Sequence, residues 1–186
     1  SIAPLMEEPE RLYEALEFYF EAYKEHNGRM WAGKLGLKGF NAGDEGLVTE
    51  LTSILQRVET DMTIFFRMLS TIRRPDVDHL RFAFYNEDAI PEDEWNDWLG
   101  KWWDRVNEKP DQEKMRSSNP KYVLRNWMAQ LAIDAAEKED YSVAIELYEL
   151  LKRPYDEQTE FESRWFNKRP EWARHRVGCS MLSCSS

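Results

Sequence analysis

Hydrophobic side chains recur at intervals of three or four residues along most of this chain, and that spacing is typical of amphipathic helices. The first helix is expected to begin near Glu7 or Glu8 and to end near Leu35. Pro9 would lie in its first turn, where a proline is tolerated because the backbone amide has no helical partner there. One face carries a series of large apolar side chains: Leu12, Tyr13, Leu16, Tyr19, Phe20, Tyr23 and Met30. The segment therefore predicts a long helix with a strongly hydrophobic stripe.

A second helical pattern follows a glycine-containing loop at residues 36–46. Asp44 is expected to cap the start of this helix, because a carboxylate can accept hydrogen bonds from the free amides of a first turn. Apolar positions then recur from Leu47 to Leu69, and Pro75 ends the run. The next segment, residues 76–88, fits a short helix as well as a strand.

A tryptophan-rich helix is expected after Pro91. Its apolar residues share one face at positions i, i+3, i+4 and i+7, and they are Trp95, Trp98, Leu99 and Trp102. Such a stripe is more often core or domain interface than a ligand cage, and we interpret it in that way. Residues 107–118 are polar and contain Pro110, so they are expected to form a connection.

The most informative stretch is Asn-Pro-Lys-Tyr-Val-Leu-Arg-Asn-Trp at residues 119–127, which continues to Ala136. It predicts a buried helix in which Asn119 is the N-cap and Pro120 takes the first helical position. Arg125 and Asn126 interrupt the apolar stripe and need partners, and an arginine fork suits a carboxylate or several backbone carbonyls. The alternative interpretation is an ordinary helix surface with one polar pair. The stripe itself comprises Val123, Leu124, Trp127, Met128, Leu131, Ile133 and Ala135.

One more helix is expected from Tyr141 to Leu151, ended by Pro154. The remaining residues, 155–186, mix aromatic side chains with arginine and lysine. This locally basic part is interpreted as a solvated tail tethered by its aromatic residues, and a docking role is the alternative. The predicted fold is all-α, with a helical domain at residues 1–153 and an extended, irregular tail at residues 154–186.

The overall charge narrows the range of partners. The chain has 186 residues, a formal net charge of −10 and an isoelectric point near 4.9. This acidity argues against a nucleic-acid groove or an anionic membrane surface as partner. Charged residues also interrupt the apolar stretches before the roughly 20 residues that a membrane-spanning helix needs. Ser1 is not an initiating methionine, so the natural N-terminus and any targeting signal are expected to lie upstream.

Sequence signals for catalysis are missing from the chain. The glycines at residues 36–46 lack the G-x-G-x-x-G order and the Gly-Lys-Ser/Thr order that phosphate-binding loops use. Kinase-type lysine, catalytic-loop and Asp-Phe-Gly signatures are also absent. His26, His79 and His175 are widely separated, and two cysteines cannot complete a four-ligand zinc site, so no metal site is expected. We therefore expect no catalysis by this segment alone.

Cys179 and Cys184 are the residues with the most distinctive chemistry. They are expected to lie in a flexible, accessible tail. Arg174 and Arg176 are close enough in sequence to favour the thiolate, which is the reactive form of cysteine. Two ordinary reduced thiols are an equally acceptable interpretation from the residues alone.

Several of these motifs together resemble the selenoprotein O family, also called SelO or YdiU, whose members are pseudokinase-like protein adenylyltransferases. Residues 119–127 resemble a signature near the family's C-terminal end. The sequences at residues 32–37, 61–63 and 66–69 resemble its helical segment just upstream. The ending Cys184-Ser185-Ser186 is similar to the family's terminus, where many members place selenocysteine or cysteine third from the end. The resemblance covers nearly the whole chain, but only the C-terminal part of the family's length.

The resemblance implies a mainly helical C-terminal part of a protein kinase-like fold. It implies that the complete protein uses ATP and Mg²⁺ to transfer AMP to hydroxyl side chains of protein substrates, whereas neither cofactor is expected to bind this segment. The expected partners are an upstream kinase-like catalytic domain and the protein substrates, without nucleic acid or membrane. The compartment would be the mitochondrion in a eukaryote and the cytoplasm in a bacterium. Asn119, Arg125, Asn126 and Trp127 are assigned to scaffolding and docking.

The resemblance also implies redox chemistry at Cys184, and less securely at Cys179, because relatives carry selenocysteine at the position of Cys184. Relatives commonly show a Cys-x-x-Cys spacing, whereas four residues separate the two cysteines here, which disfavours a local pair. A disulfide from Cys184 to the upstream domain is one alternative. Two other functions stay open: a stand-alone helical interaction module, which a start codon just before Ser1 would support, and a thiol oxidoreductase that works without ATP.

Overall fold

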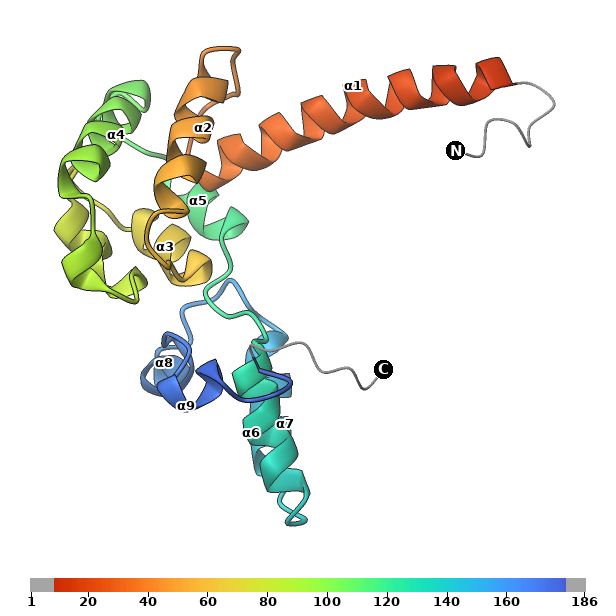
Figure 1. Ribbon diagram of the computed structural model, residues 1–186, viewed down its shortest axis with the longest axis vertical. Coiled ribbons are helices and arrows are strands. Elements are labelled where there is room, and N and C mark those ends of the chain that lie inside the picture. The colour runs from red at the N-terminus through yellow and green to blue at the C-terminus, as the bar shows by residue number, and fades with distance from the viewer. Residues whose placement is uncertain (1–8, 180–186) are drawn as a thin grey trace.

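The computed structural model describes residues 9–179 of the chain, and these residues form an all-helical structure (Figure 1). Within this range no β-strand is present, and Thr60 and Phe84 form an isolated antiparallel bridge. The predicted all-α class is therefore confirmed. In chain order the elements are α1 (Pro9–Lys34), α2 (Asp44–Leu55), α3 (Met62–Leu69), the 3-10 helices η2 (Val77–Ala83) and η3 (Glu87–Ala89), α4 (Glu92–Arg105), α5 (Gln112–Ser118), α6 (Asn126–Ala136), α7 (Ser142–Leu151), α8 (Thr159–Trp165) and α9 (Glu171–Arg174).

The buried side chains form two separate hydrophobic cores. One core draws on residues 32–115 and the other on residues 122–179. We call residues 9–119 the first body and residues 121–179 the second body. A single covalent connection, at Pro120, joins them, and Figure 1 shows the second body below the first.

The first body is built around the tryptophan stripe of α4. The indole rings of Trp98 and Trp102 lie stacked, with centroids 6.1 Å apart and an angle of 4° between the planes. Their ring nitrogens donate hydrogen bonds to the backbone oxygens of Leu47 at 2.8 Å and Leu35 at 2.9 Å. Both polar groups of these large rings are thus satisfied inside the core. The interpretation of this stripe as core is confirmed.

The second body packs α6 against α7 and covers one end of the pair with α8. Trp127 of α6 and Trp165 of α8 bring their rings to 5.9 Å, and both are buried. Leu147 and Leu150 on the inner face of α7 complete the contact. The expected helix at residues 141–151 is therefore present.

Two features of α2 and α3 differ from the sequence prediction. The run from Leu47 to Leu69 is divided into α2 and α3, because Asp61 caps a new helix by accepting a hydrogen bond from the Ile64 amide at 3.1 Å. Asp44 is the first residue of α2 rather than its cap. Its buried carboxylate instead binds the guanidinium of Arg105, at 2.6 and 2.9 Å.

The polar stretch that was expected to be a connection contains α5. Asp111 caps this helix through the Lys114 amide at 3.0 Å, and Met115 is fully buried against the first core. One buried methionine on a short helix is too weak a pattern to detect by periodicity.

The helix predicted from Pro120 starts only at Asn126, so that prediction was wrong for residues 120–125. Asn119 ends α5 instead of capping α6, and its side chain is committed to contacts far away in the sequence. The extended tail expected after residue 153 also differs, since α8 and α9 lie there and Trp165 and Ala173 belong to the second core.

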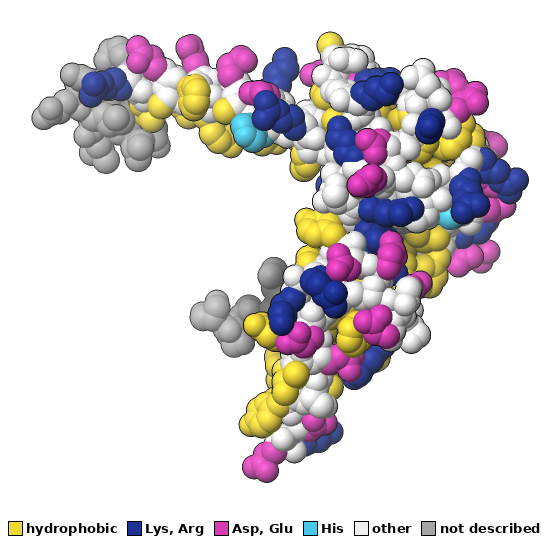
Figure 2. Space-filling view, turned by 180° about the vertical axis from the view of Figure 1, so that it is seen from behind, with side chains coloured by type: hydrophobic (Ala, Val, Ile, Leu, Met, Phe, Trp, Pro, Cys, Tyr) yellow, Lys and Arg dark blue, Asp and Glu magenta, His cyan; other side chains and the backbone are white. Residues whose placement is uncertain are grey.

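Two helical projections give the molecule its outline. The helix α1 extends from the first body as an arm, and the α6–α7 hairpin extends from the second body (Figure 1). Together they border a hollow on one side of the molecule (Figure 2). Among the helices of residues 9–179, none combines the length and the apolar character that crossing a membrane requires.

Candidate functional site

The segment of residues 119–127 lies at the junction of the two bodies. Asn119 is fixed to the first body: its side-chain amide donates to the Lys34 backbone oxygen at 3.0 Å, and its amide oxygen accepts from the Lys34 ammonium at 3.2 Å. Its backbone oxygen accepts from Arg67 at 3.2 Å. Asn119 is almost fully buried, so these bonds replace those that water would otherwise make.

Lys121 and Tyr122 are fixed to the second body. Their backbone amides lie 2.8 and 3.1 Å from the backbone oxygen of Pro154. The buried Lys121 ammonium binds the carboxylates of Glu157 at 2.9 Å and Glu162 at 2.8 Å. Burial alone would lower the pKa of Lys121, but the hydrogen bonds to Glu162 and Glu157 outweigh burial, so its pKa is raised. The ammonium thus stays charged and paired.

Arg125 has the partners expected for an arginine fork. It forms a two-pronged ion pair with Asp61, in which Nη2 lies 3.0 Å from Oδ1. It also donates to the backbone oxygen of Asn167 at 2.7 Å. Asp61 is the cap of α3, and Arg125 directly precedes α6, so this pair joins the starts of two helices from different bodies. A paired, bidentate geometry of this kind fixes direction as well as distance.

Asn126 and Trp127 both contact the second body, Asn126 from an exposed position and Trp127 from a buried one. The Asn126 side-chain amide donates to the backbone oxygen of Cys179 at 3.2 Å. Trp127 is buried against Trp165, although its ring nitrogen has no partner among the described residues. The four residues assigned to scaffolding therefore face different parts of the molecule: Asn119 holds the first body, Arg125 joins the two bodies, and the other two hold the second.

Sequence reasoning missed the partners of this segment. Asp61, Arg67 and Glu157 are between 36 and 90 residues away from the groups they bind. The only local sign was an aspartate in front of a helical pattern at Asp61, which is a common capping arrangement. The predicted need of Arg125 for a carboxylate gave the type of partner but no position.

Exposed apolar side chains follow the hydrophobic stripe predicted for α1. Tyr13, Leu16, Tyr19, Phe20 and Tyr23 all lie on this stripe and are all exposed, Phe20 by 63%. The opposite face carries glutamates. Figure 2 shows hydrophobic side chains along the underside of the α1 arm, facing the hollow. Apolar patches of this extent on one helix mark a contact surface.

The α6–α7 hairpin presents a second exposed apolar surface. Its large exposed side chains are Ile133, Tyr141, Ile145 and Tyr148. In Figure 2, hydrophobic atoms lie along the side of the hairpin that borders the same hollow as α1. We call these two surfaces together the cradle.

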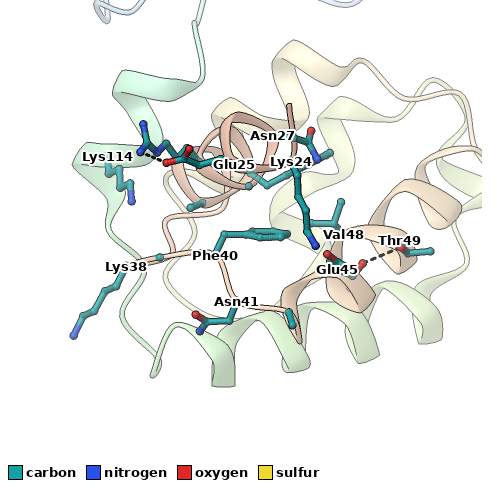
Figure 3. A pocket seen from close by; sticks show the side chains of 16 residues that line it. Lys24, Glu25, Asn27, Lys38, Phe40, Asn41, Glu45, Val48, Thr49 and Lys114 are labelled. Carbon is teal, nitrogen blue, oxygen red and sulfur yellow. Dashed lines mark hydrogen bonds and ion pairs between the residues drawn. The ribbon is translucent and has the colours of Figure 1, made fainter. Parts of the chain in front are cut away.

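A surface pocket of about 850 Å³ lies where α1 meets the first body (Figure 3). Its floor is the Phe40 ring, which approaches α1 closely because Gly28 has no side chain: a Cβ there would lie 3.0 Å from the ring. Lysines from three segments surround it, namely Lys24, Lys38 and Lys114. The Lys114 ammonium is already bound to the Leu37 backbone oxygen at 2.7 Å. The residues that line the pocket include Gly28 and Gly39 but no glycine-rich loop of the kind that binds phosphates in nucleotide sites.

The two cysteines differ in what the structure shows. Cys179 is buried in the second core, in contrast to the accessible position expected for it, because its side chain packs into that core beside α6. Cys184 lies outside the described residues. Among residues 9–179, no three histidine, cysteine or carboxylate groups come together as a metal site.

These features define a helical, two-body segment with an exposed apolar cradle. A profile of the family described as "Protein adenylyltransferase SelO" matches residues 1–152. The chain belongs to the SelO family. It is similar to proteins named "Protein nucleotidyltransferase YdiU", with 46% identity over 199 residues in Flavobacterium johnsoniae, 44% over 195 in Aromatoleum aromaticum and 43% over 210 in Rhodopirellula baltica.

All three alignments cover 100% of this chain, but only 37–39% of the length of each relative. The chain thus spans less than two fifths of the curated relatives it matches. More than half of each relative has no counterpart in this chain.

Proposed function

We propose that this chain is the non-catalytic helical part of a protein that transfers AMP from ATP, with Mg²⁺, to hydroxyl side chains of other proteins. The names of the relatives and of the family support a nucleotidyltransferase. The reacting groups belong to the part of the protein that this chain does not contain. Because the relatives reported above are bacterial, we place the protein in a bacterial cytoplasm rather than in a mitochondrion.

The role of the chain follows from one observation, the exposed cradle. Several large apolar side chains on the α1 arm are more than half exposed, for example Phe20 at 63% and Tyr23 at 58%. Complete burial of one such side chain in a contact is favourable by about 1.5–3 kcal/mol of free energy. The occupant we assign is the remaining part of the same protein, since about three fifths of each relative's length lies outside the matched region.

Residues 119–127 act as the scaffold for this contact. They fix the first body, which carries α1, to the second body, which carries the α6–α7 hairpin. The contacts of Asn119, Lys121 and Arg125 described above support this role. A correctly placed cradle would hold the catalytic part in one position relative to both bodies.

A matched pair of substitutions in the complete protein tests the proposal. Phe20→Glu places a charge on the apolar stripe of α1, whereas Phe18→Glu makes the same change on the opposite face, where Phe18 is 76% exposed. We expect Phe20→Glu to reduce transfer of AMP to a protein substrate at least tenfold, because a charge cannot be buried in that contact. Phe18→Glu should retain most of the activity. Labelled ATP and gel autoradiography measure the transfer.

Two results would contradict the proposal. Normal transfer by a folded Phe20→Glu protein would remove the cradle from the contact, and equal losses in both variants would show that the stripe is not the contact face. A stand-alone interaction module predicts a third result: no AMP transfer by the complete protein, and a band near 22 kDa in a blot of cell extract.

For redox control we propose Cys184 rather than Cys179. Burial of Cys179 in the second core argues against its reaction with a solvent-borne oxidant. Cys184 is favoured because the ending Cys184-Ser185-Ser186 resembles the terminus of family members that carry selenocysteine or cysteine third from the end. A change in gel mobility on reduction that is lost in Cys184→Ser, and retained in Cys179→Ser, would support this choice, and a change retained in Cys184→Ser would refute it.

A further inference from the structure

The two bodies are connected in a way that allows relative movement. Each body has its own core, and the chain passes between them only once, at Pro120. The element pairs with the most extensive packing all lie within one body, such as α3 with η2 and α6 with α7. Movement of one body against the other would leave the buried side chains of both cores in place and would change only the packing of Phe166 against the first core.

The fixed points on each side of Pro120 are adjacent in sequence. Asn119 is held by Lys34 and Arg67 of the first body. Lys121 is held by backbone and carboxylate groups of the second body. Only Pro120 stands between the two sets of contacts.

A proline at this point restricts the direction of movement. Its ring fixes φ near −65°, and it keeps the preceding residue in the extended region. Asn119 shows this conformation, with φ −119° and ψ 99°. The remaining freedom is mainly the ψ angles of Asn119 and Pro120, so the bodies can turn about few axes.

Ion pairs connect the two bodies. Carboxylates of the first body face cations of the second: Asp61 binds Arg125, and Glu59 binds both Arg169, at 2.6 Å, and Arg174. In one further pair the cation, Arg67, belongs to the first body and the carboxylate, Glu157, to the second. Lys168 also donates to the Phe84 backbone oxygen at 2.6 Å. We call these pairs the clasp.

Aromatic rings of the first body also meet the second body at the junction: Lys168 lies over the Phe82 and Tyr85 rings, and Arg169 over the Tyr85 ring. Phe166 of the second body contributes to both cores, with its ring 6.4 Å from that of Phe82. Beside it lies an open cavity of about 480 Å³, lined from one side by Arg67, Met68 and Thr71 and from the other by Lys121, Glu162 and Asn167 among others. Solvent therefore reaches this part of the junction, unlike the closely packed interior of either core.

From these observations we infer that Pro120 is the pivot of a hinge, and that the clasp holds the hinge closed. Opening turns the second body about Pro120 and moves the α6–α7 hairpin relative to the α1 arm. The width of the hollow between them therefore depends on the state of the clasp. This device would adjust the cradle to the remaining part of the protein, a consequence that rests on the proposed function.

Distances between two spin labels in the complete protein test the hinge. The labels replace Asp93 of α4 and Ala144 of α7, which are exposed positions on different bodies, and use a non-cysteine attachment chemistry. The clasp variant is Glu59→Gln with Asp61→Asn, where the asparagine can still cap α3. The control variant, Glu50→Gln with Asp97→Asn, removes the same charge from two carboxylates that bind Lys101 within the first body.

We expect one narrow distance in the unsubstituted protein, with an open state of at most about 10%. The clasp variant should place most molecules in a second, distinct distance, and the control variant should match the unsubstituted protein. About 1 M salt, which shortens the screening length to about 3 Å, should populate the same second distance without any substitution. Pro120→Gly should broaden the distances because it frees φ.

The hinge is refuted by an unchanged narrow distance in a folded clasp variant, or by equal broadening in the control variant. Circular dichroism checks folding. If the clasp variant fails to fold, the salt titration of the unsubstituted protein decides, and an unchanged distance at high salt then overturns the inference.

Discussion

The two bodies achieve stability by different means. Among the described residues, twenty-three buried apolar residues form the first core and eight form the second. Each body contains one buried indole without a hydrogen-bond partner, Trp95 in the first and Trp127 in the second. The other buried indoles differ: those of Trp98 and Trp102 bond to backbone oxygens, whereas that of Trp165 uses the Glu146 side chain at 2.5 Å. The first body can therefore be expected to stand alone, while the second relies more on polar contacts with its neighbour.

The largest expected effect follows from truncating the central ring of the first core. Trp102→Ala should lower the free energy of unfolding by about 3–5 kcal/mol, the usual cost of a large cavity, because the ring is fully buried and stacked. Hydrogen exchange with mass spectrometry should show faster exchange across the first body. Trp165→Ala should loosen the second body alone.

A result in which either substitution loosens both bodies equally would contradict the separation of the cores. Trp172→Ala provides a control for the loss of an indole. Because Trp172 is substantially exposed, this substitution should change the free energy of unfolding little.

The next effect concerns the contact between the bodies. Arg125→Ala leaves the buried Asp61 carboxylate without its cation, and removing one partner of such a pair typically costs about 3 kcal/mol. Asp61→Asn should offset part of that loss in the double variant, because no uncompensated charge then remains. Denaturant unfolding of the two single variants and the double variant measures the coupling. Strict additivity would mean that the pair does not join the bodies.

Local patterns predicted the elements that depend on a long apolar stripe. The helices α1, α4 and α7 were anticipated because their stripes continue for several turns and end at Lys34, Arg105 and Leu151, close to the expected ends. The short helix α5 was missed, since it presents only Met115 to the core.

The junction could not be predicted from local patterns. Asn119 followed by proline is a common helix-start signal, but no helix starts there, and the side chain of Asn119 binds Lys34, which lies 85 residues earlier. Arg125 likewise meets Asp61 across 64 residues. A single sequence gives the chemical type of such a partner but not its position, because tertiary contacts override a local preference.

A smaller effect is expected from a turn in the first body. Gly36 has φ of +67°, and a Cβ there would lie 2.8 Å from the Met115 sulfur and 3.0 Å from the Asp111 backbone nitrogen. Gly36→Ala should therefore cost about 1–3 kcal/mol through backbone strain. Gly39→Ala is the matched control, because nothing lies within 4 Å of its Cβ position. Thermal unfolding compares the two, and equal melting temperatures would show that the turn can relax.

The smallest effect concerns acid and the second body. Burial raises the pKa of Glu157, but the Lys121 hydrogen bond and the charges of Arg67 and Lys121 more than offset it, so its pKa is lowered on folding. A lowered pKa contributes stability above the unfolded value, near 4.3 for glutamate, which is lost as the pH falls through the folded value. Because the side chain is 53% exposed, solvent screening should keep the contribution below about 1 kcal/mol.

The Glu157 carboxylate is charged at about pH 7 and is protonated as the pH falls towards about pH 3. Glu157→Gln has no such charge to lose, so its free energy of unfolding should fall less between these two pH values. Exchange rates in α8 and in residues 119–125 give the local readout, because both segments depend on Lys121 and its carboxylates. Glu149→Gln, which removes a carboxylate paired with Lys152 on the surface of α7, is the control. If both variants respond to acid in the same way, Glu157 is an ordinary surface carboxylate, and the second body owes its acid sensitivity to the remaining pairs of the clasp.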